Sequence, residues 1–280
     1  MNTGLSAVGF ASSSILNLSR AETTLGGALS KLTSGRRINR AADDAAGLAI
    51  ASDTAVRITQ MRQASRNASD TLSALTVADG ALAQASEVST RMQELATMAA
   101  SGTYTDEQRG ALQTEYTALS EEIVRIGQTA SHNGVNLLDG SNLSVQIGPS
   151  GETVHVGGIN LQALSNPITS QDISTQAGAE AAVTSVEQFV QELTSQRSSI
   201  VGSAMARLES MNTTTSSQTI AQSSALSQIQ DADLSSAVID LTKARLLLRY
   251  QVTLIQQSSL PTRLSVLGWG SAAPPHVGLR

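Results

Sequence analysis

The positions of the prolines constrain this chain most, because a proline inside a helix removes a backbone hydrogen bond and clashes with the preceding turn. The five prolines fall at positions 149, 167, 261, 274 and 275. Residues 1–148 and 168–260 therefore contain no proline, and both stretches are rich in Ala, Leu, Gln, Ser and Thr. The sequence predicts two long helical arms that flank a short centre.

Apolar residues recur in both arms at steps of three and four, the spacing of one helix face. The first arm carries two such stripes, Leu82, Ala85, Val88, Met92, Leu95 and Ala99, and then Leu112, Tyr116, Leu119, Ile123 and Ile126. The second arm carries one, Val183, Val186, Val190, Leu193, Ile200, Ala204, Leu208 and Met211, with Arg197 at the intervening step. Stripes this narrow are typical of coiled-coil seams.

Capping signals divide the first arm into helices over about 4–33, 44–100 and 105–129. Thr33-Ser34-Gly35 is a stop signal, and Thr105 followed by two acidic residues is a capped restart. The second arm runs over about 172–257, with an adjustment near residues 230–233. At 1.5 Å per residue the longest helix would measure about 80 Å, more than the diameter of a compact domain of this size. We therefore expect a rod.

The centre has the pattern of a small β-hairpin, within about 131–170. Asn133-Gly134 and Asp139-Gly140 are turn dipeptides. Alternating apolar residues, Leu143, Val145 and Ile147 before the turn 148–151 and Val154 and Val156 after it, predict the two strands. The predicted fold class is mainly α, an elongated antiparallel helical bundle or coiled coil with a small β-hairpin region.

Both ends of the chain are amphipathic as well. Two narrow helices cannot bury such surface alone, so we expect other copies of the chain to cover it. The residues that we expect to mediate this self-assembly are Leu5, Val8, Ile15, Leu18, Leu25 and Leu29 at one end, and Leu234, Val238, Leu241, Leu248, Val252 and Ile255 at the other.

The composition excludes several classes of function. The chain has no cysteine, so no disulfide, thiolate metal site or cysteine nucleophile is expected. Its three histidines, His132, His155 and His276, have no metal-ligand spacing. Asp43 and Asp44 are adjacent and do not face one another on a helix, which favours a helix-start charge cluster over an acid–base pair. We predict no catalytic residue, no cofactor and no metal.

Charge gives no support for a nucleic-acid or membrane partner. The net charge is −5, although residues 31–66 carry seven basic and three acidic residues, a local balance of +4. That segment has no aromatic residue on which bases could stack. Charged contacts to a partner subunit are the better interpretation. No stretch approaches the roughly 18 consecutive apolar residues of a spanning helix, and the first residues lack the pattern of a secretory signal.

Residues 32–50, LTSGRRINRAADDAAGLAI, closely resemble the N-terminal signature of bacterial flagellins. The resemblance continues in RNASD (66–70), ADGAL (78–82), RMQELA (91–96) and NGVNLL (133–138). Its C-terminal counterpart is SQIQDAD (227–233), followed by LTK (241–243) and Leu260-Pro261. Together these motifs extend over nearly the whole chain to about residue 268.

This resemblance implies a structural subunit that polymerises into the extracellular flagellar filament and serves motility. It implies export through the flagellar type III apparatus without a cleaved signal peptide, and contacts with the flagellar cap, junction proteins and an export chaperone. By analogy residues 1–43 and 230–268 form the inner tube, and 44–229 form the outer tube with its hairpin facing outward. The chain resembles a minimal flagellin without outer domains.

The resemblance also implies a contact with the innate flagellin receptor of vertebrates, through residues that match Arg91, Leu95 and Glu115. Two features depart from the family pattern. Arg249 and Tyr250 stand where small residues are usual, and residues 269–280 form an atypical tail without helical periodicity.

Two alternatives to a filament subunit remain. A hook–filament junction protein shares the terminal helices but matches the 32–50 signature less well. A flagellin-like cell-surface protein that binds polysaccharide is disfavoured, because the six aromatic residues leave few platforms on which sugar rings could stack. Enzymatic activity has no positive support.

Overall fold

A computed structural model describes residues 3–148 and 151–267, with side chains for residues 13, 15–148 and 151–254. It divides the chain into two compact units. The terminal unit comprises Met1–Thr54 and Ser224–Arg280, and the central unit comprises Ala55–Ser223. The limits of these units differ from the expected tube boundaries at residues 43 and 230, and the atypical tail predicted for 269–280 lies outside the described residues.

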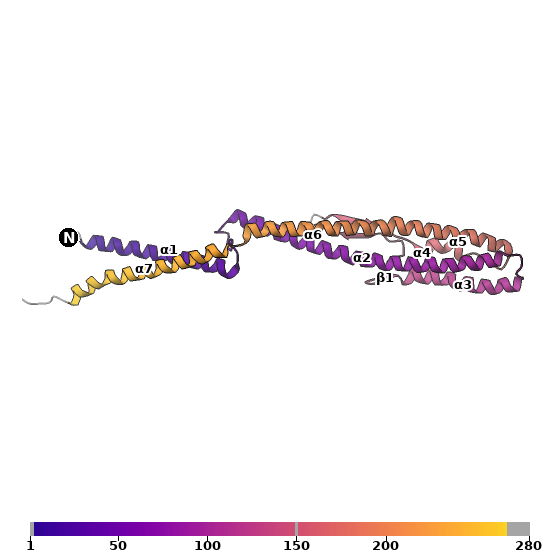
Figure 1. Ribbon diagram of the computed structural model, residues 1–280, viewed down its shortest axis with the longest axis horizontal. Coiled ribbons are helices and arrows are strands. Elements are labelled where there is room, and N and C mark those ends of the chain that lie inside the picture. The colour runs from indigo at the N-terminus through magenta and orange to yellow at the C-terminus, as the bar shows by residue number, and fades with distance from the viewer. Residues whose placement is uncertain (1–2, 149–150, 268–280) are drawn as a thin grey trace, which may run out of the picture. The chain divides into compact units, whose positions relative to one another are not determined.

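The terminal unit contains helix α1 (Thr3–Ser34) and helix α7 (Leu234–Leu267), which pack side by side (Figure 1). Helix α1 ends as predicted at Gly35, whose φ of 69° lies in the left-handed region that glycine adopts without strain. The segment after it pairs with residues 230–232, which precede α7: Arg37 N donates to Gln230 O (2.7 Å), and Ala232 N donates to Gly35 O (2.9 Å). The interruption predicted near residues 230–233 is this hydrogen-bonded break in the helix.

The long helices of the central unit begin and end close to the predicted positions. Helix α2 spans Ala45–Ala100 and enters this unit at Ala55, and α3 spans Asp106–Thr129. The α3 start is a capping box in which Thr105 Oγ1 accepts from Gln108 N and Gln108 Oε1 accepts from Thr105 N. Both acidic residues of its first turn stand where the helix dipole favours them.

The second arm is interrupted, where the sequence predicts one helix from about 172. It consists of α5 (Gln176–Gln196), a π-helical segment η1 (Arg197–Gly202) and α6 (Ser203–Gln230). The extra residue of a π-helical turn shifts the helix phase. Val201 is buried here, and the predicted seam residue Ile200 is half-buried and packs against the core.

The centre forms two small hairpins rather than one. The first pairs β1 (Ser131–His132) with β2 (Val135–Asn136), and the second pairs β3 (Leu143–Gln146) with β4 (Thr153–Val156). Asn133 and Gly134, with φ of 50° and 80°, are both positive, as a two-residue type I′ turn requires. In the second hairpin Val145 lies opposite Val154, and both side chains are buried. The predicted strands are confirmed.

A short helix, α4 (Leu161–Thr169), was not expected from the sequence, because we interpreted Pro167 as a break. Asn160 caps its start by accepting a hydrogen bond from Ala163 N (2.8 Å). Pro167 lies near the end of this nine-residue helix, where its missing N–H removes a single helical hydrogen bond. The helix buries Leu161, Ser165 and Ile168 against its neighbours.

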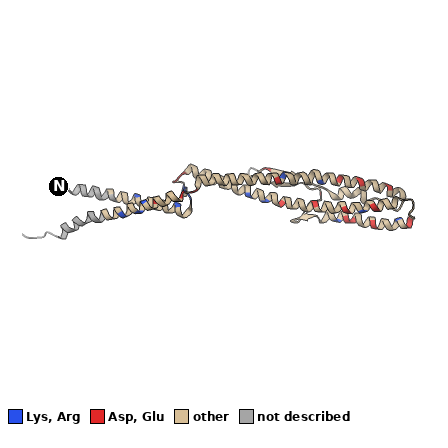
Figure 2. Ribbon diagram, in the orientation of Figure 1, with Lys and Arg blue, Asp and Glu red and all other residues tan. Residues whose placement is uncertain are grey.

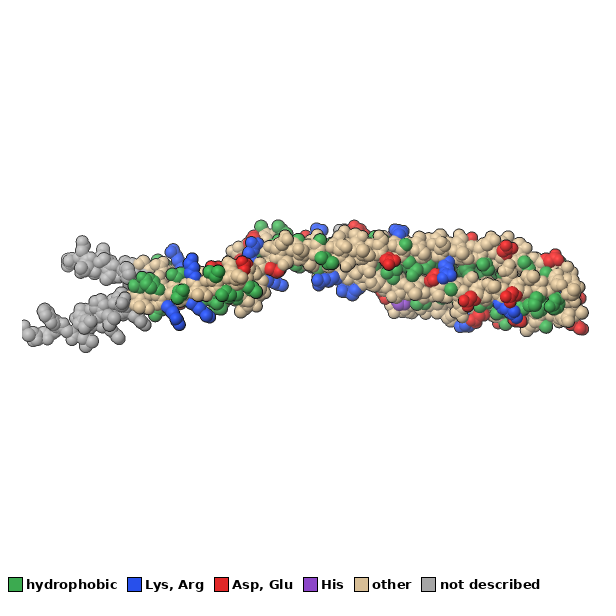
Figure 3. Space-filling model, in the orientation of Figure 1, with side chains coloured by type: hydrophobic (Ala, Val, Ile, Leu, Met, Phe, Trp, Pro, Cys, Tyr) green, Lys and Arg blue, Asp and Glu red, His purple; other side chains and the backbone are tan. Residues whose placement is uncertain are grey.

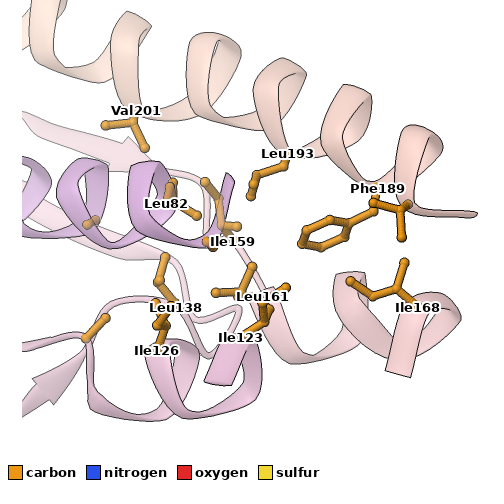
Figure 4. Packing of buried hydrophobic residues seen from close by; sticks show 14 of the residues in the cluster. Leu82, Ile123, Ile126, Leu138, Ile159, Leu161, Ile168, Phe189, Leu193 and Val201 are labelled. Atoms are coloured by element: carbon orange, nitrogen blue, oxygen red, sulfur yellow. The ribbon is translucent and has the colours of Figure 1, made fainter. Parts of the chain in front are cut away.

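The core of the central unit lies among α2, α3, α4, α5 and the second hairpin (Figure 4). The predicted stripe on α2 is buried at Leu82, Ala85, Met92, Leu95 and Ala99. Val88 is only half-buried, and the buried position beside it is the polar Ser89, whose hydroxyl donates to Ala85 O at 2.6 Å. A serine can occupy this face because its hydroxyl is satisfied within its own helix.

Tyr116 is the buried aromatic residue of the predicted α3 stripe. Its hydroxyl donates to Ile168 O of α4 at 3.1 Å, which ties these two helices together. Burial raises the pKa of Tyr116 to about 12, so the hydroxyl stays protonated and keeps its role as a donor at neutral pH. Among the described helices, none is both long enough and apolar enough to span a membrane.

Candidate assembly surface

Helices α1 and α7 meet along alanines. Ala21 and Ala28 on α1, and Ala237 and Ala244 on α7, are each at most 7% exposed. In both helices the two alanines are seven residues apart, so they lie on one face two turns apart. Leucines at the steps of three and four between these alanines, such as Leu25 and Leu241, are half-buried and complete the seam.

Ten of the larger apolar side chains of these two helices face solvent (Figure 3). We name them the α1–α7 apolar surface: Ile15, Leu16, Leu29, Leu234, Val238, Ile239, Leu246, Leu247, Tyr250 and Val252, which are 40–66% exposed. Seven residues of α7, including Val238, Ile239, Leu246, Leu247 and Tyr250, line one shallow depression. Isolated surface leucines are normal in a soluble protein, whereas a continuous apolar face marks an interaction site.

The predicted self-assembly residues divide into three groups. Ile15, Leu29, Leu234, Val238 and Val252 are exposed and belong to the surface. Leu18, Leu25, Leu241 and Leu248 are half-buried, and lie closer to the seam between the helices. The side chains of Leu5, Val8 and Ile255 lie outside the described residues.

Periodicity missed five members of the surface, Leu16, Ile239, Leu246, Leu247 and Tyr250, because they fall beside the predicted stripes. A signal was available in the run Leu246-Leu247-Leu248. Consecutive residues on a helix are about 100° apart, so one neighbouring helix cannot cover all three. Such a run indicates contacts on more than one side.

The segment between α1 and α2 is held by its own polar groups. Asp43 Oδ2 accepts from Asn39 N (3.0 Å) and Arg40 N (2.9 Å), and these hydrogen bonds hold the pKa of Asp43 below its usual value. Asp44 Oδ1 accepts from Gly47 N (2.8 Å) in the first turn of α2. The interpretation of this acidic pair as a helix-start cluster is confirmed.

The basic residues of 31–66 include some that serve the chain itself. Arg37 Nη2 donates to Ile229 O at 2.8 Å, and the guanidinium of Arg66 donates to Gln63 Oε1 on its own helix. These bonds already engage part of the cationic surface. Charged contacts from this segment to a partner subunit stay a prediction.

The structure separates the three residues of the expected receptor contact. Arg91 and Glu115 form an exposed ion pair, in which Nε and Nη2 donate to one carboxylate oxygen at 3.0 and 2.8 Å. Leu95 has no exposed surface. Its side chain packs in the core of the central unit, so the exposed part of the expected contact is the Arg91–Glu115 pair, and the receptor contact stays a prediction.

The two histidines of the described residues each lie beside one polar side chain. His132 Nε2 lies 3.2 Å from Asp70 Oδ1, and His155 Nδ1 lies 2.8 Å from Ser144 Oγ, in separate hairpins. No three acidic or histidine side chains of the described residues gather where they could hold a metal ion. His276 lies outside the described residues.

Family comparisons agree with the helical arms. Residues 6–143 match the model of the bacterial flagellin N-terminal helical region, and residues 183–259 match that of the C-terminal helical region. The chain is 32% identical over 237 residues to a flagellin of Halalkalibacterium halodurans, covering 83% of this chain and 87% of the relative. It is 29% identical over 254 residues to the flagellar filament 31.3 kDa core protein of Treponema maltophilum, covering 84% and 88%.

Two solved structures are similar as well. The crystal structure of Bacillus cereus flagellin is 29% identical with a TM-score of 0.50, over 54% of this chain and 88% of that one. A putative flagellar hook-associated protein from Vibrio parahaemolyticus gives a TM-score of 0.57 at 15% identity, over 68% of this chain and all of that one. At that identity the second likeness concerns the fold alone.

Proposed function

The chain belongs to the bacterial flagellin family and is a structural subunit of the flagellar filament, and we propose that it polymerises through the α1–α7 apolar surface. The observation that carries this proposal is the arrangement of side chains on the two helices. Alanines and half-buried leucines join α1 to α7, while ten large apolar side chains face outward. A surface of this kind is stable in water only when something covers it.

The size of the α1–α7 apolar surface supports its burial by neighbouring copies of the chain. Burying one large aliphatic or aromatic side chain stabilises by about 1.5–3 kcal/mol. Ten side chains that are each about half exposed would then contribute on the order of 10 kcal/mol per subunit. Part of this offsets the entropy lost on association. Because α1 and α7 expose different side chains, contacts between copies can be heterologous, and heterologous contacts that do not close into a ring generate helical filaments.

We assign residues 1–43 and 230–268 to the inner tube and 44–229 to the outer tube. Support comes from the contrast between the two units. The central unit has a continuous buried core of its own, whereas the apolar residues of α1 and α7 are largely exposed. Helices α1 and α7 can bury their exposed apolar side chains against other copies, so they suit the interior of a polymer, where other copies surround each subunit.

A filament subunit works outside the cell and must be delivered there. We propose export through the flagellar type III apparatus without a cleaved signal peptide, folding under the cap, and contacts with junction proteins and an export chaperone. These steps follow from membership of the family. The many apolar side chains that α1 and α7 leave exposed are compatible with a chain whose ends unfold readily for passage through a narrow channel.

The direct test replaces one residue of the surface and a matched residue elsewhere. Ile239 on α7 is 66% exposed, and Ile220 on α6 in the central unit is 70% exposed. We expect Ile239→Asp to abolish elongation of flagellar seeds, measured by electron microscopy, because a buried carboxylate is unfavourable. Ile220→Asp should elongate as the wild-type chain does. Normal filaments from Ile239→Asp, with helical content confirmed by circular dichroism, would refute the proposed surface.

The same assay addresses the junction alternative and the C-terminal departures. Long homopolymers on purified seeds are expected for a filament subunit and not for a junction protein. A chain truncated after Gly268 should polymerise at least as well as the full chain, because the tail adds no predicted helix. Tyr250 is 62% exposed within the surface, so Tyr250→Ala tests whether the bulky residue contributes to assembly or hinders it.

A receptor contact is a second candidate, favoured by the exposed pair of Arg91 and Glu115. We expect soluble monomer to activate a reporter of the vertebrate innate flagellin receptor, and Arg91→Ala to weaken that signal. Gln93→Ala, on the same helix, is the control. If the wild-type monomer gives no reporter signal, the proposed receptor contact is refuted.

A further inference from the structure

Helix α7 carries exposed apolar side chains on the side that faces away from α1. Ala237 and Ala244 are the buried residues of its seam with α1. Ile239 and Leu246 each follow one of these alanines by two residues, which places them nearly opposite the seam. Their side chains are 66% and 61% exposed. The pairing with α1 therefore leaves this side of α7 open to a partner.

Basic side chains border the open side of α7. Lys243, Arg245 and Arg249 are all exposed, and Lys243 lines the shallow apolar depression on this helix. In the part of the chain that the structure describes, no acidic side chain forms an ion pair with any of them. Residues 238–252 contain three basic residues and one acidic residue, Asp240, a balance of +2 in a chain whose net charge is −5. The surface is thus locally apolar and cationic.

The two departures from the family pattern, Arg249 and Tyr250, lie within this stretch. Arg249 adds a positive charge where a small residue is usual. Tyr250 adds an aromatic ring that is 62% exposed and carries a polar hydroxyl. Tyrosine is enriched where an apolar phase meets water, because one end of its side chain suits each side. Both departures therefore change α7 in the direction of an interfacial helix.

We propose that α7 of the monomer docks along the surface of an anionic phospholipid bilayer, with its apolar side chains among the acyl chains and its basic side chains at the lipid phosphates. An apolar face bordered by Lys and Arg is the pattern of helices that lie in the plane of a membrane interface. None of the described helices is long and apolar enough to cross a membrane, so α7 lies along the surface.

The negative charge of the whole chain does not oppose this contact. The potential of a charged surface falls off within a Debye length, about 8 Å at physiological ionic strength. Residues close to the bilayer therefore determine the attraction, and on α7 these are mainly basic. The absence of a membrane partner that we expect from net charge overlooks this local balance.

The docking requires only a single chain and goes beyond the proposed polymerisation. Ile239, Leu246 and Tyr250 belong to the α1–α7 apolar surface, so they can be buried by lipid or by a neighbouring copy but not by both. Bilayer and filament therefore compete for the same face of the monomer.

The first experiment places a fluorophore on the docked face. The chain contains no cysteine, so Leu246→Cys supplies a unique attachment point for an environment-sensitive dye. We expect its emission to shift to the blue with vesicles of phosphatidylcholine and phosphatidylglycerol, and much less with phosphatidylcholine alone. Ile220→Cys, at a 70% exposed position of α6, is the matched control and should show no shift.

The second experiment measures partition of the unlabelled full-length monomer by vesicle flotation. Each Lys or Arg near an anionic surface contributes about a fivefold factor, so Arg245→Gln combined with Arg249→Gln should lower the partition about 25-fold. Arg62→Gln combined with Arg66→Gln removes the same charge from α2 and should change it less than about twofold. Added NaCl should weaken the binding of the wild-type chain.

Three results would overturn the proposal: no binding of the wild-type chain to anionic vesicles, equal binding to both kinds of vesicle, or equal effects of the two double variants. A dye shift that follows self-association in sedimentation velocity, and that vesicles do not increase, would assign this face to a second copy instead. Seeded elongation of the wild-type chain reports on polymerisation separately. A chain that elongates seeds but does not bind anionic vesicles refutes the lipid contact alone.

Discussion

At the scale of single residues, Arg109 is a buried polar anchor of the central unit, because its side chain is only 6% exposed. Its Nε donates to Ala99 O (2.8 Å) and its Nη2 donates to Ser101 O (3.0 Å), while Nη1 pairs with Asp106 (3.1 Å). The guanidinium thus satisfies carbonyl groups at the end of α2, where helical partners run out. The apolar periodicity of α3 cannot reveal this role, because it predicts that a charged residue on this helix faces solvent.

We expect Arg109→Met to lower the free energy of unfolding of the central unit by about 2–4 kcal/mol, because it leaves two buried carbonyl groups without donors. Urea denaturation followed by circular dichroism measures the change. Arg125→Met removes an exposed pair on the same helix and should stay within about 0.5 kcal/mol. Equal effects of the two substitutions would show that the Arg109 contacts add nothing to stability.

Asp79 gives a prediction on pH. The hydrogen bonds from Arg197, together with its charge, hold the pKa of Asp79 below its usual value. A carboxyl group with a lowered folded pKa stabilises the fold above its unfolded pKa, and this contribution is lost as pH falls through the folded value. The difference in unfolding free energy between the wild-type chain and Asp79→Asn should therefore shrink below about pH 4. A difference that is constant from pH 7 to pH 3 would contradict this.

At the scale of helices and strands, the sequence specified the elements with strong local signals. The start of α3 at Thr105, the end of α1 before Gly35 and the turn at Asn133-Gly134 were predictable, because each depends on residues next to it in the sequence. Helix α4 was missed because the tertiary contacts of Leu161 and Ile168 outweigh the signal of Pro167. The π-helical segment was missed for a different reason, since the apolar stripe fits an uninterrupted helix equally well and the deciding contacts come from α2.

Two helical glycines predict opposite effects of the same substitution. Alanine normally stabilises a helix by up to about 1 kcal/mol relative to glycine. Gly110 on α3 has nothing near its missing Cβ, so Gly110→Ala should raise the melting temperature. Gly178 on α5 would place a Cβ 2.0 Å from Asp172 O, so Gly178→Ala should lower it. Differential scanning calorimetry measures the melting temperature of both variants. A higher melting temperature for Gly178→Ala would show that the backbone of residues 172–175 moves away from the new Cβ at little cost.

At the scale of the whole molecule, charge is segregated along the chain. Residues 80–197 contain thirteen acidic and four basic residues, a balance of −9, whereas the rest of the chain carries ten acidic and fourteen basic residues, a balance of +4. Figure 2 shows most of the acidic residues of the central unit in the half that contains the α2–α3 turn. Copies placed side by side in a polymer bring these like charges together.

We expect the rate of seeded elongation to rise with NaCl between about 10 and 150 mM, because the Debye length falls from about 30 to 8 Å and weakens this repulsion. Light scattering with purified monomer measures the rate. A variant with Glu121 and Glu187, both exposed, changed to Gln should depend less steeply on salt. A rate that falls with salt would mean that attraction between opposite charges, rather than repulsion, governs the approach of copies.

The seam between α1 and α7 couples the folding of the chain ends to the growth of the filament. The seam of alanines and half-buried leucines leaves ten large apolar side chains of these helices exposed, so much of the free energy that keeps the ends ordered has to come from neighbours. Folding of the ends and growth of the filament are then one thermodynamic step. The monomer can stay soluble and pliable until it reaches the growing tip, and the finished polymer becomes hard to dissolve because leaving it means unfolding.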